Sequence, residues 1–218
     1  MKSLKNVLID ARVVPSPADD LCLAFANTRY WRGSEAPTEG LSNFTDLLTW
    51  CEQAKLLHPS HKFRGWCANN AGATASLFDA AITARELVYS VFLAIADGGG
   101  CSVKDLRALN RLLAEAPPRS QLARQGPACG WRLPAAKPAL EQVLAPVLWS
   151  ASDLLTGARR ARVRCCANDK CRWLFLDDSK SGTRRWCAMS ACGNRAKAHR
   201  HYLKTREGKV PLALVGRG

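Results

Sequence analysis

The stretch ARVRCCANDKCRWLFLDDSKSGTRRWCAMSACGNR, residues 161–195, decides how the last quarter of this chain folds. It contains two cysteine pairs of equal spacing: four residues lie between Cys166 and Cys171, and four between Cys187 and Cys192. A spacing that occurs twice is less frequent by chance than a single pair, and two short segments that each supply two ligands typically build a structural zinc site. The sequence therefore predicts one structural Zn²⁺ held by four thiolates, with no open position for water.

Other interpretations of the cysteines and histidines stay open at this point. Cys165 directly precedes Cys166 and can replace it as a ligand, and buried or redox-active thiols need no metal. His199 and His201 are possible ligands too, but four thiolates already complete a tetrahedral site, which favours a place for both in a basic helix. The other cysteines show no paired spacing and are expected to be small apolar residues: Cys22, Cys51, Cys67, Cys101 and Cys129.

The residues around the two pairs predict a hairpin followed by a helix. CRWLFL (171–176) is typical of an apolar strand, DDSKSG (177–182) of a turn, and TRRW (183–186) of a return strand. From Cys187 onward the sequence suits a helix whose first turns carry the second pair, where the partial positive charge of a helix N-terminus stabilises thiolates. A zinc knuckle, a hairpin and a helix in this order form a treble-clef arrangement.

The same segment carries nearly all of the excess positive charge. The chain has 218 residues and a formal net charge of +14. Residues 1–157 contain 16 Lys and Arg against 14 Asp and Glu, whereas residues 158–218 contain 16 against 4, a net +12. Four thiolates on Zn²⁺ would reduce this value to about +10, which still predicts a polyanion-binding surface. We expect phosphate contacts from the basic residues near the metal and along the helix: Arg184, Arg185, Arg195, Lys197, Arg200, Lys204 and Arg206.

The residues before this segment predict a mixed α/β domain that is rich in helix. Four segments show helical periodicity with recognisable caps or stops: 43–57 with Ser42 or Asn43 as cap, 70–96 before the glycines at 98–100, 102–116 with Ser102 as cap, and 138–157. Pro146 should kink the last helix or split it in two. A short strand is expected at 130–134, after a turn at Gly126-Pro127.

Two stretches near the start of the chain are less regular. Residues 19–31 contain apolar residues in alternation, which fits a buried strand, while a helix capped by Asp19 or Asp20 is the competing interpretation. The Gly-, Pro- and polar-rich residues 31–41 predict a loop.

These motifs resemble a known family. Cys166-Ala167-Asn168, Arg184-Arg185-Trp186-Cys187 and Cys192-Gly193-Asn194-Arg195 together resemble the CGNR zinc finger, over about residues 164–206. Upstream, Leu21-x-Leu23-x-Phe25-x-Asn27-Thr28 and Ala145-Pro146 resemble the ABATE domain, which accompanies this finger in bacterial stress-induced transcription regulators. The resemblance implies an α+β N-terminal domain, a zinc-bound C-terminal module and nucleic-acid binding.

We therefore expect an α+β protein with two domains and a tail. Residues 1–160 would form an ABATE-like sensing or dimerisation domain, 161–208 the treble-clef-like zinc finger, and 209–218 a flexible C-terminal tail. The expected function is that of a bacterial transcription regulator that binds duplex DNA, with a small-molecule effector or a homodimer as further partners. Asn27 and Thr28 are candidates for a ligand pocket, and a hydrogen-bonding role at the end of a strand is the alternative. Two other functions remain: an RNA- or ribosome-associated accessory protein, and an adaptor that docks on an acidic protein.

Two classes of function are disfavoured. The sequence shows no recognisable set of nucleophile, base and oxyanion donors, and its one clear metal site is closed, so we do not expect an enzyme. Residues 1–14, MKSLKNVLIDARVV, lack the apolar run of a signal peptide, and no segment approaches the roughly 20 apolar residues of a membrane helix. We therefore expect a cytoplasmic protein, and in that compartment clustered cysteines bind metal or do redox chemistry more often than they form structural disulfides.

Overall fold

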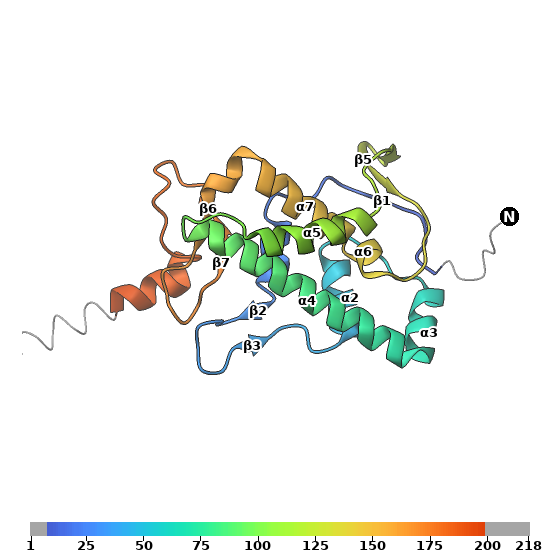
Figure 1. The fold of residues 1–218 in the computed structure, drawn as a ribbon, viewed down its shortest axis with the longest axis horizontal. Coiled ribbons are helices and arrows are strands. Elements are labelled where there is room, and N and C mark those ends of the chain that lie inside the picture. The colour runs from blue at the N-terminus through green and yellow to red at the C-terminus, as the bar shows by residue number, and fades with distance from the viewer. Residues whose placement is uncertain (1–7, 199–218) are drawn as a thin grey trace, which may run out of the picture.

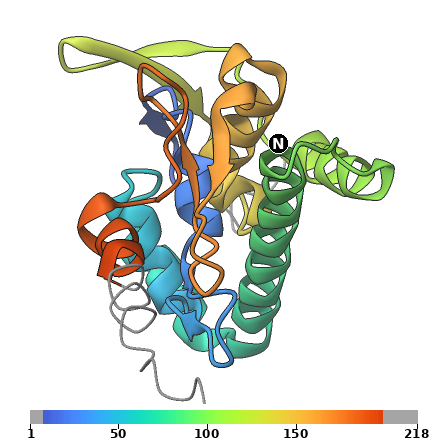
Figure 2. The same ribbon diagram turned by 90° about the vertical axis from the view of Figure 1, so that its left-hand side faces the viewer.

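One long helix, α4 (Ala71–Ala96), organises the fold, as the sequence predicts for residues 70–96. The structure is a computed structural model that describes residues 8–198. In Figures 1 and 2, α4 runs along the body and the other helices pack around it. These are α1 (Leu21–Ala26), α2 (Phe44–Gln53), α3 (His61–Asn69), α5 (Val103–Glu115), α6 (Leu140–Val143) and α7 (Ala145–Thr156). No helix within residues 8–198 has both the length and the apolar character that crossing a membrane requires.

The side chains of α4 explain its central place. Ala81, Ala84, Val88 and Phe92 recur at helical spacing and are each at most 2% exposed, so one stripe of the helix faces the core. Arg85 lies on the same stripe and is only 1% exposed. Its guanidinium donates hydrogen bonds of 2.5 and 2.7 Å to Glu39, and Nε donates to Glu86. The paired carboxylates offset the cost of burying this charge.

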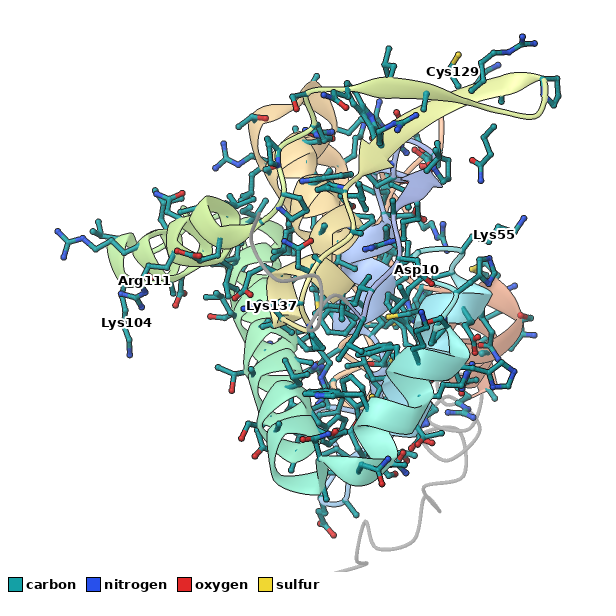
Figure 3. All side chains as sticks on the ribbon, turned by 90° about the vertical axis from the view of Figure 1, so that its right-hand side faces the viewer. Asp10, Lys55, Lys104, Arg111, Cys129 and Lys137 are labelled. Atoms are coloured by element: carbon teal, nitrogen blue, oxygen red, sulfur yellow. The ribbon has the colours of Figure 1, made fainter. Side chains whose placement is uncertain are left out.

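The helix boundaries follow the caps that the sequence shows. Asn43 caps α2 by accepting a hydrogen bond from the backbone N–H of Asp46, and Ser102 caps α5 in the same way from Asp105. Pro146 splits the predicted helix 138–157 into α6 and α7, and it stands in the first turn of α7, where a missing N–H costs nothing. Helix α3 was not predicted, because only Phe63 among its residues is fully buried and the apolar pattern is weak. Helix α5 projects from the body, with Lys104 and Arg111 pointing away from it (Figure 3).

Residues 21–26 form helix α1, so the strand interpretation of this stretch is wrong and the helix interpretation is confirmed. Cys22, Leu23, Phe25 and Ala26 are all buried. A helix enclosed on several sides shows no exposed face, so its sequence does not reveal a period of 3.6. Asp20 occupies the N-cap position, but neither aspartate caps the helix with its side chain; instead Ser150 accepts a 3.0 Å hydrogen bond from the N–H of Cys22.

The residues described in the structure form three small antiparallel sheets. The first has the order β1-β5-β4 and consists of β1 (Arg12–Val14), β4 (Leu122–Gln125) and β5 (Ala128–Leu133). The predicted turn at Gly126 joins β4 to β5, and the positive φ of 60° there suits glycine. The second pairs β2 (Arg29–Tyr30) with β3 (Thr38–Glu39), on either side of most of the predicted loop.

The third sheet corrects the predicted hairpin. Strand β7 (Leu174–Leu176) pairs with β6 (Val163–Cys165), which precedes the first cysteine pair, and not with residues 183–186. The reason is burial: Val163, Leu174 and Leu176 join the main core beside the N-terminal helices, whereas the side chains at 183–185 are exposed. The first cysteine pair thus lies at the tip of a hairpin whose base is packed into the body of the protein.

Candidate metal centre and nucleic-acid interface

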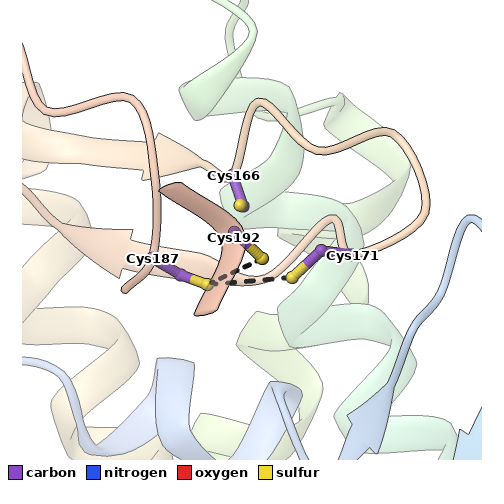
Figure 4. Close-up of side chains that lie close together, drawn as sticks. All are labelled: Cys166, Cys171, Cys187 and Cys192. Carbon is purple, nitrogen blue, oxygen red and sulfur yellow. Dashed lines mark hydrogen bonds between the residues drawn. The ribbon is translucent and has the colours of Figure 1, made fainter. Parts of the chain in front are cut away.

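The four predicted cysteines converge on one point (Figure 4). Cys166 follows β6 and Cys171 precedes β7, while Cys187 ends the loop before a helical turn, Met189–Gly193, that carries Cys192. The four Sγ atoms all lie within 4.8 Å of one another. Cys187 Sγ is 3.8 Å from both Cys171 Sγ and Cys192 Sγ, and none of the four forms a disulfide.

This geometry fits one zinc ion. A tetrahedral site with Zn–S bonds of about 2.3 Å places its sulfur atoms about 3.8 Å apart. The observed contacts have this length, and three of the four cysteines are buried while Cys187 is half-buried. Cys165 is not part of the cluster; it lies in β6 and packs against the main core. The distances between the sulfur atoms therefore place Cys166, and not Cys165, among the residues that can bind the metal.

The protonation of the thiols also favours a bound cation. A hydrogen bond from Cys171 lowers the pKa of Cys166 to about 5, whereas burial raises the pKa of Cys187 to about 12. Without a cation, Cys166 therefore ionises easily, whereas Cys187 keeps its proton. Zinc supplies the positive charge that allows all four to ionise, so its binding releases protons and weakens as the pH falls.

Asn168 orders the turn between the first two cysteines. Its carbonyl oxygen accepts hydrogen bonds from the N–H groups of Cys171 and Arg172, and its Oδ1 accepts from Lys170. Its Nδ2 lies 3.6 Å from Cys192 Sγ, where it can donate to the sulfur. Hydrogen bonds of this kind orient metal ligands and stabilise their charge. In the sequence, only the motif around Cys166 points to this role of Asn168.

Aromatic side chains surround the cluster. Phe175, Trp173 and Trp186 pack on the cysteines, as expected for the small core of a finger. Trp31 joins them from the N-terminal part of the chain, and its φ of 52° is unusual for a residue other than glycine. Sequence reasoning missed Trp31, because nothing local connects it to cysteines more than 130 positions away.

Asn27, Tyr89 and Gly33 hold the finger on the body through hydrogen bonds to its backbone. Asn27 is 3% exposed, and its amide donates a 2.7 Å hydrogen bond to the carbonyl of Leu174 and accepts one of 3.0 Å from the same residue's N–H. Tyr89 Oη donates to the carbonyl of Arg172 at 2.9 Å. The N–H of Gly33 donates to the carbonyl of Lys170 at 3.2 Å.

These contacts bear on the predicted ligand pocket. One N–H and the oxygen of the Asn27 side chain bind the backbone of Leu174, and Asn27 follows helix α1 as its C-cap and does not end a strand. Thr28 is buried, donates to the carbonyl of Phe25, and accepts from Arg85. It is also one of the residues that line a recess of about 270 Å³ beside Trp50. A ligand pocket at Asn27 and Thr28 therefore stays a prediction.

We expect Gly33→Ala to loosen the finger. A Cβ atom at this position would lie 1.7 Å from the carbonyl oxygen of Asp169, so the knuckle would have to move. Overpacking of this kind costs about 1–3 kcal/mol or more. Thermal unfolding should show a lower melting temperature, and a competing chelator should remove zinc faster. Gly72→Ala is the matched control, because a Cβ there meets nothing within 4 Å and alanine favours helix α4; an equal loss in the control would contradict the steric explanation.

The structure describes four of the seven predicted nucleic-acid residues. Arg185 lies over the ring of Trp186 and Arg195 over that of Trp31, with 5.5 and 4.6 Å between guanidinium carbon and ring centre, and Lys197 is exposed. Arg184 instead donates to the carbonyls of Trp186 and Cys187, so its guanidinium stabilises the loop before the second cysteine pair. Arg200, Lys204 and Arg206 lie outside the described residues, as does the predicted tail 209–218.

A recess of about 440 Å³ opens beside the cysteine cluster. Lys170 and Arg195 line it with Trp186, and one carboxylate residue, Asp169, shares it. The cations come from the knuckle and from the residues after Cys192, so the fold brings together charges that are 25 positions apart. Lys170 and Arg195 are both exposed and therefore present their positive charges to the same recess.

An α+β body that carries a four-cysteine metal centre defines a zinc-finger protein, and comparison with known families agrees. Residues 162–205 match the family model of the CGNR zinc finger. Residues 19–158 match the ABATE model, described as "Putative stress-induced transcription regulator". Because this second match covers more than half of the chain, the chain belongs to the ABATE family. No curated protein matches the sequence.

Proposed function

We propose that this chain is a DNA-binding transcription regulator whose zinc finger contacts the phosphate backbone of duplex DNA. The observation that carries the proposal is the set of exposed cations beside the cysteine cluster. Arg195 lies 4.6 Å from the ring centre of Trp31, which restricts its rotation before any partner binds. A cation that is already ordered loses less conformational entropy on binding. The division into an N-terminal domain of residues 1–160 and a finger of residues 161–208 is part of this proposal.

The finger would bind as part of the whole protein and not as an independent module. Asn27, Gly33 and Tyr89 tie the knuckle and β7 to the N-terminal residues, so the basic surface has a fixed orientation relative to the body. A change in the body can therefore reach the finger through these contacts. A cavity of about 630 Å³ lies between β1 and the end of α2, and Arg12, Lys55 and His58 help to line it. Its volume suits a small molecule, which supports our further proposal that the N-terminal domain senses a ligand.

A competition experiment tests the proposed partner. Zinc-loaded protein would be mixed at about 150 mM salt with random duplex DNA and with structured RNA of equal length, and the bound fraction would be sequenced. We expect enrichment of a duplex DNA motif. Enrichment of RNA would instead favour the RNA- or ribosome-associated alternative, and enrichment of neither would favour an acidic protein as the partner.

Replacing Arg195 and Lys197 together by alanine should weaken DNA binding without loss of zinc. Each phosphate contact contributes about 0.9 to the slope of log affinity against log salt, so the slope should decrease by about 1.8. Zinc content should stay that of the wild type, because neither residue belongs to the group of four cysteines, and the melting temperature should fall by only a few degrees, because Arg195 gives up its contact with Trp31. An unchanged slope would show that these two residues do not contact phosphates.

A further inference from the structure

A second basic element lies in the body, outside the finger. Residues 116–140 contain Arg119, Arg124, Arg132 and Lys137 but no Asp or Glu. Residues 1–157 as a whole carry 16 basic and 14 acidic residues, so the same segment without 116–140 has 12 basic residues against 14 acidic ones. The positive charge of the body is therefore concentrated in the hairpin of β4 and β5 and its flanks.

Side-chain contacts anchor the base of this hairpin on α7, while its outer part, residues 124–129, is exposed to solvent. Arg119 donates two hydrogen bonds to Asp153 of α7, at 2.5 and 2.6 Å, and its guanidinium carbon is 5.9 Å from the ring centre of Trp131 and 5.5 Å from that of Trp149. Arg124 and Arg132 are exposed, and neither forms an ion pair with a carboxylate in the part of the chain that the structure describes. An anchored hairpin thus presents two cations that form no ion pair within residues 8–198.

The hairpin and the finger project on the same side of the molecule. Figure 1 places them at opposite ends of the long axis, and Figure 2 shows both extending toward the left. Helix α5, which also carries exposed cations, extends to the other side in Figure 2 and lies opposite the hairpin in Figure 3. A long polyanion that contacts the finger can therefore also reach the hairpin but not α5.

We propose that the β4–β5 hairpin is a second contact with duplex DNA, in addition to the finger; this inference rests on the proposed function. The major groove of B-DNA admits a two-stranded β-ribbon. Arg124 pairs with Cys129 across the ribbon and so shares its face, whereas Arg132, three positions after Cys129, points to the opposite face. The two-stranded tip in the groove would thus offer Arg124, while Arg132, in the three-stranded part where it pairs with Val13, would lie nearer the phosphates at the rim of the groove.

Salt-dependent affinity for duplex DNA of about 30 base pairs, roughly three helical turns, tests this inference. The variant Arg124→Ala/Arg132→Ala should bind with a slope of log affinity against log salt reduced by about 1.8, with unchanged zinc content and melting temperature. The matched control is Arg107→Ala/Arg111→Ala, which removes two exposed cations from α5 and should leave the slope unchanged. An unchanged slope in the hairpin variant, or an equal decrease in the control, would overturn the inference.

The wild-type protein offers a second readout. Cys129 is exposed, whereas the other cysteines are buried or half-buried, and it lies directly opposite Arg124. Duplex DNA should slow the alkylation of Cys129 several-fold, measured peptide by peptide with mass spectrometry. Protection by structured RNA alone, or no protection by a bound duplex, would contradict a DNA contact here. If the wild-type protein bound no duplex at all, the proposed function would fail together with this inference, whereas wild-type binding without hairpin effects would leave the finger as the contact.

Discussion

Cys187→Ser should abolish zinc binding and destabilise the whole chain, not only its finger. Cys187 contacts two of the other three sulfur atoms at 3.8 Å, so its loss leaves an incomplete site. Structural zinc contributes about 10–16 kcal/mol of apparent binding free energy in small fingers at neutral pH. This amount equals or exceeds the whole stability of a typical domain, about 5–15 kcal/mol.

The effect should spread because the finger and the body share a core. Val163, Leu174 and Leu176 are buried with the residues of α1 and α4, so an unfolded finger would expose part of that core. Burial of one such side chain is worth about 1.5–3 kcal/mol, which gives about 5–9 kcal/mol for the three together. We therefore expect one cooperative transition at a much lower temperature, and not a stable body with a loose C-terminal segment.

Zinc content by elemental analysis and thermal unfolding by circular dichroism measure both parts of this prediction. Cys165→Ser is the control, because Cys165 lies next to a proposed ligand but outside the cluster, and it should retain one zinc per chain. Full zinc in the Cys187 variant would disprove the proposed ligand set. Zinc loss with an unchanged melting temperature would disprove the coupling between finger and body.

The sequence predicted the features that local patterns encode. The equal spacing of the cysteine pairs identified the cluster, and the caps at Asn43 and Ser102 and the break at Pro146 located the helices. Each of these signals lies within a few residues of the feature that it determines.

Features that depend on distant segments were not predicted. The partner of β7 is β6 because both bury apolar residues against α4, and the pattern of residues 171–186 contains no information about α4. Similarly, Asn27 lies in a motif that suggested a pocket, but its hydrogen-bonding partner is 147 positions away. A buried polar side chain must have a partner, yet the sequence alone does not say which one.

Asn27→Ala should therefore cause a large loss of stability for a single polar residue. The substitution removes both partners of the Leu174 backbone groups at a buried position. Each unsatisfied group costs about 1–3 kcal/mol, so the loss should be about 2–6 kcal/mol. For a chain of this size, 1 kcal/mol corresponds to about 2–4 °C, and the melting temperature should decrease by roughly 5–20 °C.

The same variant tests how the body supports the metal. Leu174 lies three residues after Cys171 in the chain, so a freed β7 should let a chelator extract zinc faster, although all four cysteines are present. Asn110→Ala is the control, because Asn110 is exposed on α5 and alanine is at least as favourable in a helix. Wild-type stability and zinc retention in the Asn27 variant would show that the finger needs no support from the body at this point. Reduced retention, with Asn110→Ala unchanged, would establish Asn27 as the residue through which the N-terminal part of the chain acts on the metal centre.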